Sequence, residues 1–93
     1  LQTIVDKIII AYEPIWSIGT GLIPTLDEIS DTVDYIKNFL QSNYQSSNLV
    51  LYGGSVSNKN IDELNTISNV DGYLIGGAST KIDEIISIVE KCK

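Results

Sequence analysis

The fold of this chain is decided by the segment Lys7-Ile8-Ile9-Ile10-Ala11-Tyr12-Glu13-Pro14-Ile15-Trp16-Ser17-Ile18-Gly19-Thr20-Gly21. Its first part is an almost continuous apolar run, which is typical of a strand covered on both faces in a parallel sheet. Its second part is a loop that begins with a proline and contains two glycines. Glu13 therefore stands at the carboxyl end of a strand, where parallel barrels place catalytic groups.

Outward from this segment, strand-like and helix-like stretches alternate, which predicts an α/β fold with a parallel sheet. We expect strands over residues 7–12, 48–52 and 72–75. We expect helices that start after Thr25 and fade over 41–43, that span roughly 59–67, and that span about 81–91. The first helix should bury one face, because apolar residues recur there at intervals of three and four: Leu26, Ile29, Val33, Ile36 and Leu40.

The ends of these helices carry recognisable signals. Thr25 and Glu28 have the spacing of a capping box, in which each side chain bonds the backbone N–H of the other residue. Ser57 or Asn58 can cap the short second helix, with Ile61 and Leu64 facing inward. The last helix is expected to present one apolar side: Ile82, Ile85, Ile86 and Val89.

Composition excludes several classes of function. The 93 residues carry a net charge of −6, which argues against binding to nucleic acid, because phosphate backbones require clustered Lys and Arg. No apolar stretch approaches the ~20 residues of a membrane span. The single cysteine, Cys92, excludes an internal disulfide, fits a reducing compartment and is assigned no role.

Glycine pairs follow the second and third expected strands, in Gly53-Gly54-Ser55 and in Gly76-Gly77. Such pairs are commonly simple turns. At the carboxyl edge of a parallel sheet, however, residues without a Cβ let backbone N–H groups approach an oxyanion closely. Anion binding of this kind needs no lysine or arginine and is compatible with a negative net charge.

Three motifs together resemble the triosephosphate isomerase family: Glu13-Pro14-Ile15-Trp16-Ser17-Ile18-Gly19-Thr20-Gly21, Tyr52-Gly53-Gly54-Ser55 and Ile75-Gly76-Gly77-Ala78-Ser79. The resemblance covers essentially the whole chain and implies the C-terminal part of a (β/α)₈ TIM barrel. Such a barrel needs ~250 residues, and this chain contains no methionine. We therefore expect residues 1–93 to be the C-terminal portion of a single barrel domain, a fragment with strands one to five absent.

The resemblance implies that Glu13 is the catalytic base, which moves a proton between adjacent carbons of a triose phosphate without a metal or an organic cofactor. It implies that the phosphate is held by backbone N–H groups of Gly19, Ser55, Gly76 and Gly77. It also implies a lid that closes over the site and excludes water. The lid residues are Pro14, Ile15, Trp16, Ser17, Ile18, Thr20 and Gly21.

One departure from the family pattern concerns the lid. The family usually has Lys-Thr-Ala after Gly-Thr-Gly, whereas this chain has Leu22-Ile23-Pro24. In the family, the tyrosine that matches Tyr52 latches the closed lid through the backbone N–H at the position of Pro24. Proline has no N–H to donate. Either Tyr52 uses another partner or the latch is absent.

Two family residues have no counterpart here. The chain contains no histidine, and neither Lys7 nor Lys59 matches the family's first-strand lysine. Loss of one oxyanion donor typically costs ~10²–10³ in rate, so the 93 residues alone are not expected to be a competent isomerase.

The resemblance further implies a cytoplasmic homodimeric enzyme of glycolysis and gluconeogenesis. The alternatives are a stand-alone phosphate-binding module without catalysis and another phosphate-binding barrel enzyme. The first has no need of Glu13 and an apolar lid, and the second leaves the Glu13–Gly21 motif unexplained. Asp71, in Val70-Asp71-Gly72, is interpreted as a solvated or capping turn residue.

Overall fold

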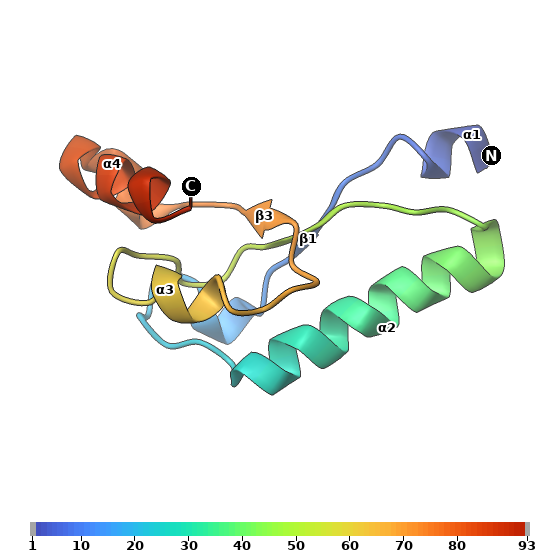
Figure 1. Ribbon diagram of the computed structural model, residues 1–93, viewed down its shortest axis with the longest axis horizontal. Coiled ribbons are helices and arrows are strands. Elements are labelled where there is room, and N and C mark those ends of the chain that lie inside the picture. Colours follow the sequence, from blue (N-terminus) through green and yellow to red (C-terminus); the bar gives the residue numbers. More distant parts are fainter. Residues whose placement is uncertain (1, 93) are drawn as a thin grey trace.

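The fold is built on three short parallel strands, seen in a computed structural model that describes residues 2–92. They are β1 (Ile10–Tyr12), β2 (Val50–Tyr52) and β3 (Gly72–Tyr73), ordered β1-β2-β3 in the sheet. Figure 1 shows them at the centre of the molecule. Tyr12 lies opposite Tyr52, which lies opposite Tyr73. Because the strands are parallel and in this register, all three loops that follow them leave the same edge of the sheet.

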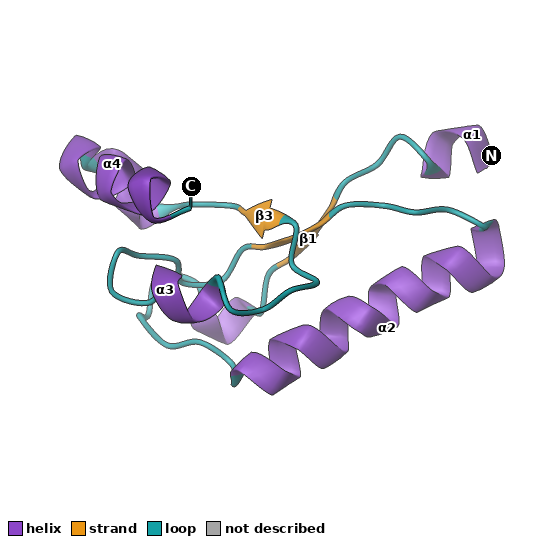
Figure 2. Ribbon diagram, in the orientation of Figure 1, coloured by secondary structure: helices purple, strands orange, loops and turns teal. Residues whose placement is uncertain are grey.

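Helices separate the strands, as the alternating pattern predicts (Figure 2). They are α1 (Gln2–Val5), α2 (Leu26–Tyr44), α3 (Ile61–Leu64) and α4 (Ile82–Lys91). Two short 3₁₀ helices, η1 (Ile15–Ser17) and η2 (Gly77–Thr80), lie in the loops after β1 and β3. The α/β character is confirmed, although α1 is not among the predicted elements.

Helix α2 has the apolar face that its periodicity predicts. Ile29, Val33 and Leu40 are buried, and Leu26 and Ile36 are partly buried against the same core. The helix continues to Tyr44, past the predicted end, and stops where Gln45 takes a left-handed conformation with φ 53°.

The N-terminal cap of α2 is half of the predicted capping box. The amide of Glu28 donates to Thr25 Oγ1 at 3.1 Å. The Glu28 carboxylate, however, accepts from the Thr25 hydroxyl at 3.0 Å, so the predicted bond to the Thr25 amide is replaced by a bond between the side chains.

The predicted strands are too long. Residues 7–9, 48–49 and 74–75 lie outside the ladders. At the amino end, the side-chain amide of Asn48 donates to the carbonyls of Val5 at 2.7 Å and Ile8 at 2.9 Å. A buried side chain thus occupies carbonyls that precede β1, and the ladder starts only at Ile10. At the other end, β2 stops at Tyr52, whose carbonyl accepts from the amide of Leu74 at 3.0 Å.

The short helix α3 also differs from its prediction, since it spans 61–64 rather than 59–67. Asn60 is its N-terminal flanking residue. The predicted cap Ser57 lies one turn earlier, where its hydroxyl accepts from the amide of Lys59 at 3.2 Å and its carbonyl from the amide of Ile61 at 3.0 Å. The Asn60 side chain accepts from the amide of Ser57 at 2.9 Å and donates to the carbonyl of Ser55 at 2.9 Å. Asn60 therefore fixes the loop between β2 and α3.

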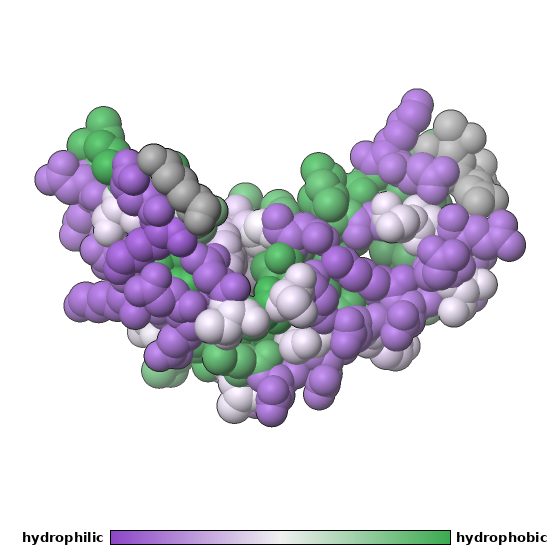
Figure 3. Space-filling view, in the orientation of Figure 1, coloured by the Kyte–Doolittle hydropathy of each residue, from purple (hydrophilic) through white to green (hydrophobic). Residues whose placement is uncertain are grey.

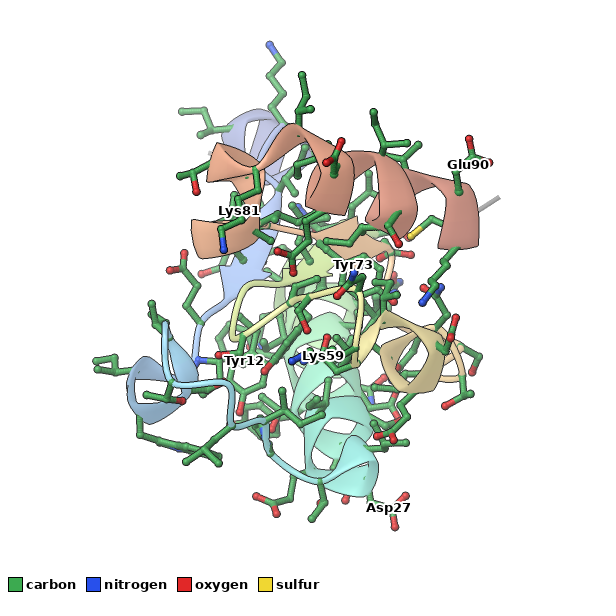
Figure 4. All side chains as sticks on the ribbon, turned by 90° about the vertical axis from the view of Figure 1, so that its left-hand side faces the viewer. Tyr12, Asp27, Lys59, Tyr73, Lys81 and Glu90 are labelled. Carbon is green, nitrogen blue, oxygen red and sulfur yellow. The ribbon has the colours of Figure 1, made fainter. Side chains whose placement is uncertain are left out.

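The core lies where α2, α3 and α4 meet the sheet. Its buried members are Ile29, Val33, Val50, Tyr52, Val56, Ile61, Leu64, Ile67 and Ile88. Helix α4 lies above Tyr73 in Figure 4, where Lys81 marks its N-terminal end and Glu90 lies near its C-terminal end. Of its predicted apolar side, Ile85 is half-buried and the other three residues are exposed, namely Ile82, Ile86 and Val89, whereas the neighbouring Ile88 is buried.

The molecule is elongated, with extents of 41 × 24 × 24 Å. Figure 3 shows hydrophobic residues in the hollow between its two ends. Within residues 2–92, β1 and β3 each pair only with β2, which leaves the two outer edges of the sheet open. Among the same residues, no helix combines the length and apolar character needed to cross a membrane.

Candidate active site

The loops that follow the three strands line one open cleft, a cavity of about 360 Å³ at the carboxyl edge of the sheet. Glu13 reaches it from β1, Gly53 and Ser55 from β2, and Gly76 and Gly77 from β3. Gly19, Ile18 and Gly21 of the loop after β1 complete that side. The predicted base and the four predicted phosphate-binding residues therefore line the same cavity.

The position of Glu13 depends on the backbone opposite it. Glu13 directly follows β1 and is exposed toward the cavity. A Cβ added to Gly53 would lie 2.8 Å from Glu13 Cγ and 3.3 Å from Leu74 Cβ. A glycine after β2 is thus required for the carboxylate to lie where it does, which the sequence motif alone did not reveal.

The loop after β3 offers backbone to the cavity rather than side chains. Gly76 and Gly77 are exposed and open η2, and a Cβ at either position would meet nothing within 4 Å. Their missing side chains leave room beside two consecutive amides, which is the environment that an anion can approach.

The predicted lid is a compact loop with a hydrogen-bonded interior. Pro14 is buried at the start of η1, whereas Ile15 and Trp16 are 86% and 55% exposed and do not line the cavity. Thr20 Oγ1 donates to the Ser17 carbonyl at 3.0 Å and accepts from the amide of Leu22 at 3.1 Å.

Two glycines of this loop have the left-handed backbone conformation that favours glycine: Gly19 at φ 72° and Gly21 at φ 78°. Any other residue would be strained at these positions. The lid therefore keeps its shape through specific backbone angles and its own hydrogen bonds.

Ser55 ties this loop to the segment after β2. Its hydroxyl accepts from the amide of Gly21 at 3.0 Å and donates to the carbonyl of Ser17. Its amide, which the resemblance assigns to the phosphate, donates to Ser17 Oγ at 3.1 Å.

Tyr52 has a partner other than the one the family uses. Its hydroxyl lies 3.1 Å from Ser17 Oγ, and both side chains are fully buried. Burial raises the pKa of the Tyr52 hydroxyl above its usual 10.0, although the hydrogen bond with Ser17 works in the opposite direction. Of the two possibilities left open by Pro24, the structure therefore shows the first.

Glu84 is a cavity residue that sequence reasoning missed. It is half-buried on α4 and brings a second carboxylate to the cavity wall. No pattern marks it, because its place depends on how α4 lies against the loop after β3. A negative charge there opposes an anionic ligand, so any phosphate must be held by groups that outweigh it.

Other predicted residues lie away from this cavity. Asp71 is neither simply solvated nor a cap: its carboxylate contacts Lys37 Nζ at 2.9 Å and accepts from the Val50 amide at 2.9 Å. Cys92 is exposed at the end of α4. Within the described part of the chain, no group of three His, Cys, Asp or Glu side chains could hold a metal ion.

Comparison with known proteins identifies the family of the chain. The family model described as triosephosphate isomerase matches residues 1–92. The triosephosphate isomerase of Amoebophilus asiaticus is 46% identical over 88 residues, which cover 90% of this chain and 35% of that protein. Those of Bradyrhizobium diazoefficiens and Rhizobium meliloti are 41% and 42% identical and cover 92% and 94% of this chain. The chain spans about a third of the length of these relatives (35–36%).

Proposed function

This chain belongs to the triosephosphate isomerase family, and from that membership we propose that it carries the base, the lid and the phosphate loops of such an isomerase. One observation carries the proposal: Glu13, Gly19, Ser55, Gly76 and Gly77 line a single cavity, although they come from three separate loops. That arrangement suits a small phosphorylated substrate, whose phosphate is held at one end while the carboxylate acts at the other.

The proposed reaction interconverts dihydroxyacetone phosphate and D-glyceraldehyde 3-phosphate. The Glu13 carboxylate removes a proton from C1, and the C–H electron pair forms a C1–C2 double bond while the carbonyl oxygen becomes the enediolate oxyanion. The hydroxyl proton moves from the oxygen on C1 to that on C2, and Glu13 returns its proton to C2. No atom or electron is gained or lost, so the step needs no oxidant or reductant. The reaction belongs to glycolysis and gluconeogenesis.

The enediolate needs electrophilic groups that this chain lacks. We assign them, a histidine and a lysine, to further strand–helix units that complete a TIM barrel around residues 1–93. The open outer edges of β1 and β3 support this assignment. So do apolar residues that are 41–60% exposed at or near the strands: Ile8, Ile9, Leu49 and Leu74. The complete protein would be a cytoplasmic homodimer.

The test of the proposed role is Glu13→Gln in the native protein that carries this segment. Removing a general base should lower kcat by ~10²–10⁴. Affinity for glycerol 3-phosphate, which has the phosphate but no carbonyl, should stay within about twofold, since the amides that hold the phosphate are unchanged. Steady-state kinetics and calorimetry measure the two quantities. If kcat and affinity fell together by the same factor, Glu13 would be a binding residue and not the base.

A further inference from the structure

The contacts around Ser17 give this residue a role that no motif assigns to it. We propose that the Ser17 hydroxyl latches the lid to the end of β2, as a positioning residue that replaces the backbone N–H missing at Pro24. The role of the lid in the reaction rests on the proposed isomerase function. The latch itself is a set of contacts that can be measured without turnover.

The protons of these contacts can be assigned from chemistry. A serine hydroxyl has one hydrogen to donate and two lone pairs that accept. The Leu22 carbonyl, 2.5 Å from Ser17 Oγ, can only accept, so Ser17 donates to it. The Ser55 amide at 3.1 Å can only donate. One lone pair of Ser17 then remains for Tyr52 at 3.1 Å, so the tyrosine hydroxyl is the donor.

This assignment uses the full hydrogen-bonding capacity of the Ser17 hydroxyl at a site with no access to water. Both Ser17 and Tyr52 have 0% exposure. The raised pKa of Tyr52 keeps its phenol protonated, and therefore a donor, at neutral pH. Removing the Ser17 hydroxyl would leave the Tyr52 hydroxyl buried without an acceptor. This costs more free energy than the loss of a hydrogen bond at the surface, where water can replace the lost partner.

Gly54 provides the space in which the latch forms. A Cβ at this position would lie 2.0 Å from Tyr52 Oη and 2.6 Å from Ser17 Oγ. The contact between Ser17 and Tyr52 therefore explains why residue 54 is a glycine, independently of any role in phosphate binding. Lid, strand end and the following turn meet at one hydroxyl.

The latch also leaves the phosphate site usable. If the Ser55 amide turns from Ser17 Oγ to a phosphate oxygen, as the proposed function requires, Ser17 keeps Tyr52 and Leu22 as partners. Because Gly19 and Gly21 follow Ser17 in the lid, holding Ser17 also holds the part of the lid that lines the cavity. A loosened latch should therefore reduce the time that the lid spends closed, and with it kcat.

The decisive experiment compares Ser17→Ala, Tyr52→Phe and the double variant in the native protein. Each single change should lower kcat ~10-fold, and the double variant should be no slower than Ser17→Ala, because both changes remove the same contact. If the two losses instead multiply, the hydroxyls do not act together and the proposal is wrong.

Ser46→Ala is the matched control. Ser46 is equally buried at 1% exposure, and its hydroxyl donates to Asn48 Oδ1 at 2.5 Å, at the opposite edge of the sheet. This variant loses a buried hydroxyl without touching the lid and should keep kcat. A loss equal to that of Ser17→Ala would show that the effect is one of general stability and would overturn the latch.

The replacement of the missing N–H is tested by Ser17→Ala/Pro24→Ala, which restores an amide at residue 24. This variant should regain most of the kcat lost in Ser17→Ala. A kcat that stays at the Ser17→Ala value would show that the hydroxyl does not stand in for that amide.

Hydrogen exchange separates the latch from the isomerase proposal. Without substrate, exchange of the Ser55 amide should quicken ~10-fold in Ser17→Ala and stay unchanged in Ser46→Ala. If Ser17→Ala does not fold, faster exchange of the Gly21 and Ser55 amides in Tyr52→Phe supports the latch, and unchanged exchange overturns it. An unmutated native protein that turns over no triose phosphate would end the isomerase proposal and leave this measurement valid.

Discussion

At the residue scale, the placement of Glu13 depends on a neighbour that has no side chain. Gly53 faces Glu13 Cγ across the end of the sheet, and a Cβ added to Gly53 would approach it more closely than packed side chains tolerate. Such dependence is typical of sites in which a reacting group must be held within a fraction of an ångström.

Gly53→Ala should therefore lower kcat more than it lowers stability. The new methyl group displaces Glu13, and a displacement of about 1 Å can cost ~10² in rate. Gly72→Ala is the control, because its Cβ would lie 3.0 Å from Leu51 Cδ2, away from the cavity. Kinetics and thermal unfolding of both variants distinguish the effects. Unchanged kcat in Gly53→Ala would show that Glu13 is free to adjust.

The same scale shows what sequence reasoning missed at the site. Glu13 and the glycines were recognisable because each belongs to a short contiguous motif. The partnership of Ser17 with Tyr52 joins residues 35 positions apart. The sequence indicated only that Tyr52 needs another partner because of Pro24, and it did not point to Ser17. Glu84 left no signal at all, since its place is set by the packing of a whole helix.

At the scale of elements, helices were easier to predict than strands. The buried face of α2 follows from periodicity, which is a local property of the sequence. The bounds of a strand depend on its partner strand, which can be distant in the sequence. For example, β1 starts only at Ile10 because the Asn48 side chain occupies the carbonyl of Ile8. The period of α4 likewise predicts an apolar side but not which residues are buried, because that depends on the neighbours of the helix.

An ion pair fastens α2 to the sheet and should make stability depend on pH. Asp71 contacts Lys37 of α2 and the amide of Val50 at the start of β2. Burial raises the pKa of Asp71, but the hydrogen bonds from Lys37 and Val50 and the charge of Lys37 together bring it below the ordinary 3.8. A carboxyl group with a lowered pKa stabilises the fold above its unfolded pKa, and that contribution is lost as the pH falls through the folded pKa.

Asp71→Asn should accordingly lower the thermal midpoint by ~2–4 °C at pH 7. The difference from the unmutated protein should shrink as the pH falls below about 3.8. Asp62→Asn is the control, because its carboxylate is 73% exposed and lies 3.7 Å from Lys91 Nζ. The measurement is the thermal midpoint of both variants and of the unmutated protein, from pH 7 down to below pH 3.8. A constant difference across that range would mean that the charge of Asp71 is irrelevant.

At the scale of the whole molecule, many large apolar side chains remain exposed to solvent because no other described part of the chain packs against them. Ile82, Ile86 and Val89 are 75%, 54% and 55% exposed along α4, and Tyr35 and Phe39 are 72% and 48% exposed along α2. Patches of this kind usually mark a surface that another part of a protein covers. This pattern is consistent with a barrel that continues beyond the 93 residues, which is how we interpret the family membership.

The isolated 93-residue chain should therefore show no measurable triose phosphate turnover above the uncatalysed rate. The native protein recognised by an antibody against residues 13–21 should have the mass of ~250 residues and should be active. Intact mass and a coupled isomerase assay on both samples test this. A native species of 10.2 kDa that binds phosphate without turnover would instead favour the stand-alone binding module. Ordinary turnover by the 93 residues alone would contradict our proposal.

Tyr52 takes part in both the hydrophobic core and the attachment of the lid. Its ring packs edge-to-face with Tyr12 in the core, with centroids 6.2 Å apart, while its hydroxyl holds Ser17. A substitution of Tyr52 that changes the packing of its ring in the core therefore also changes the contact of its hydroxyl with the lid. Exchanging Tyr52 for a smaller side chain would therefore open a gap in the core and release the lid in a single step.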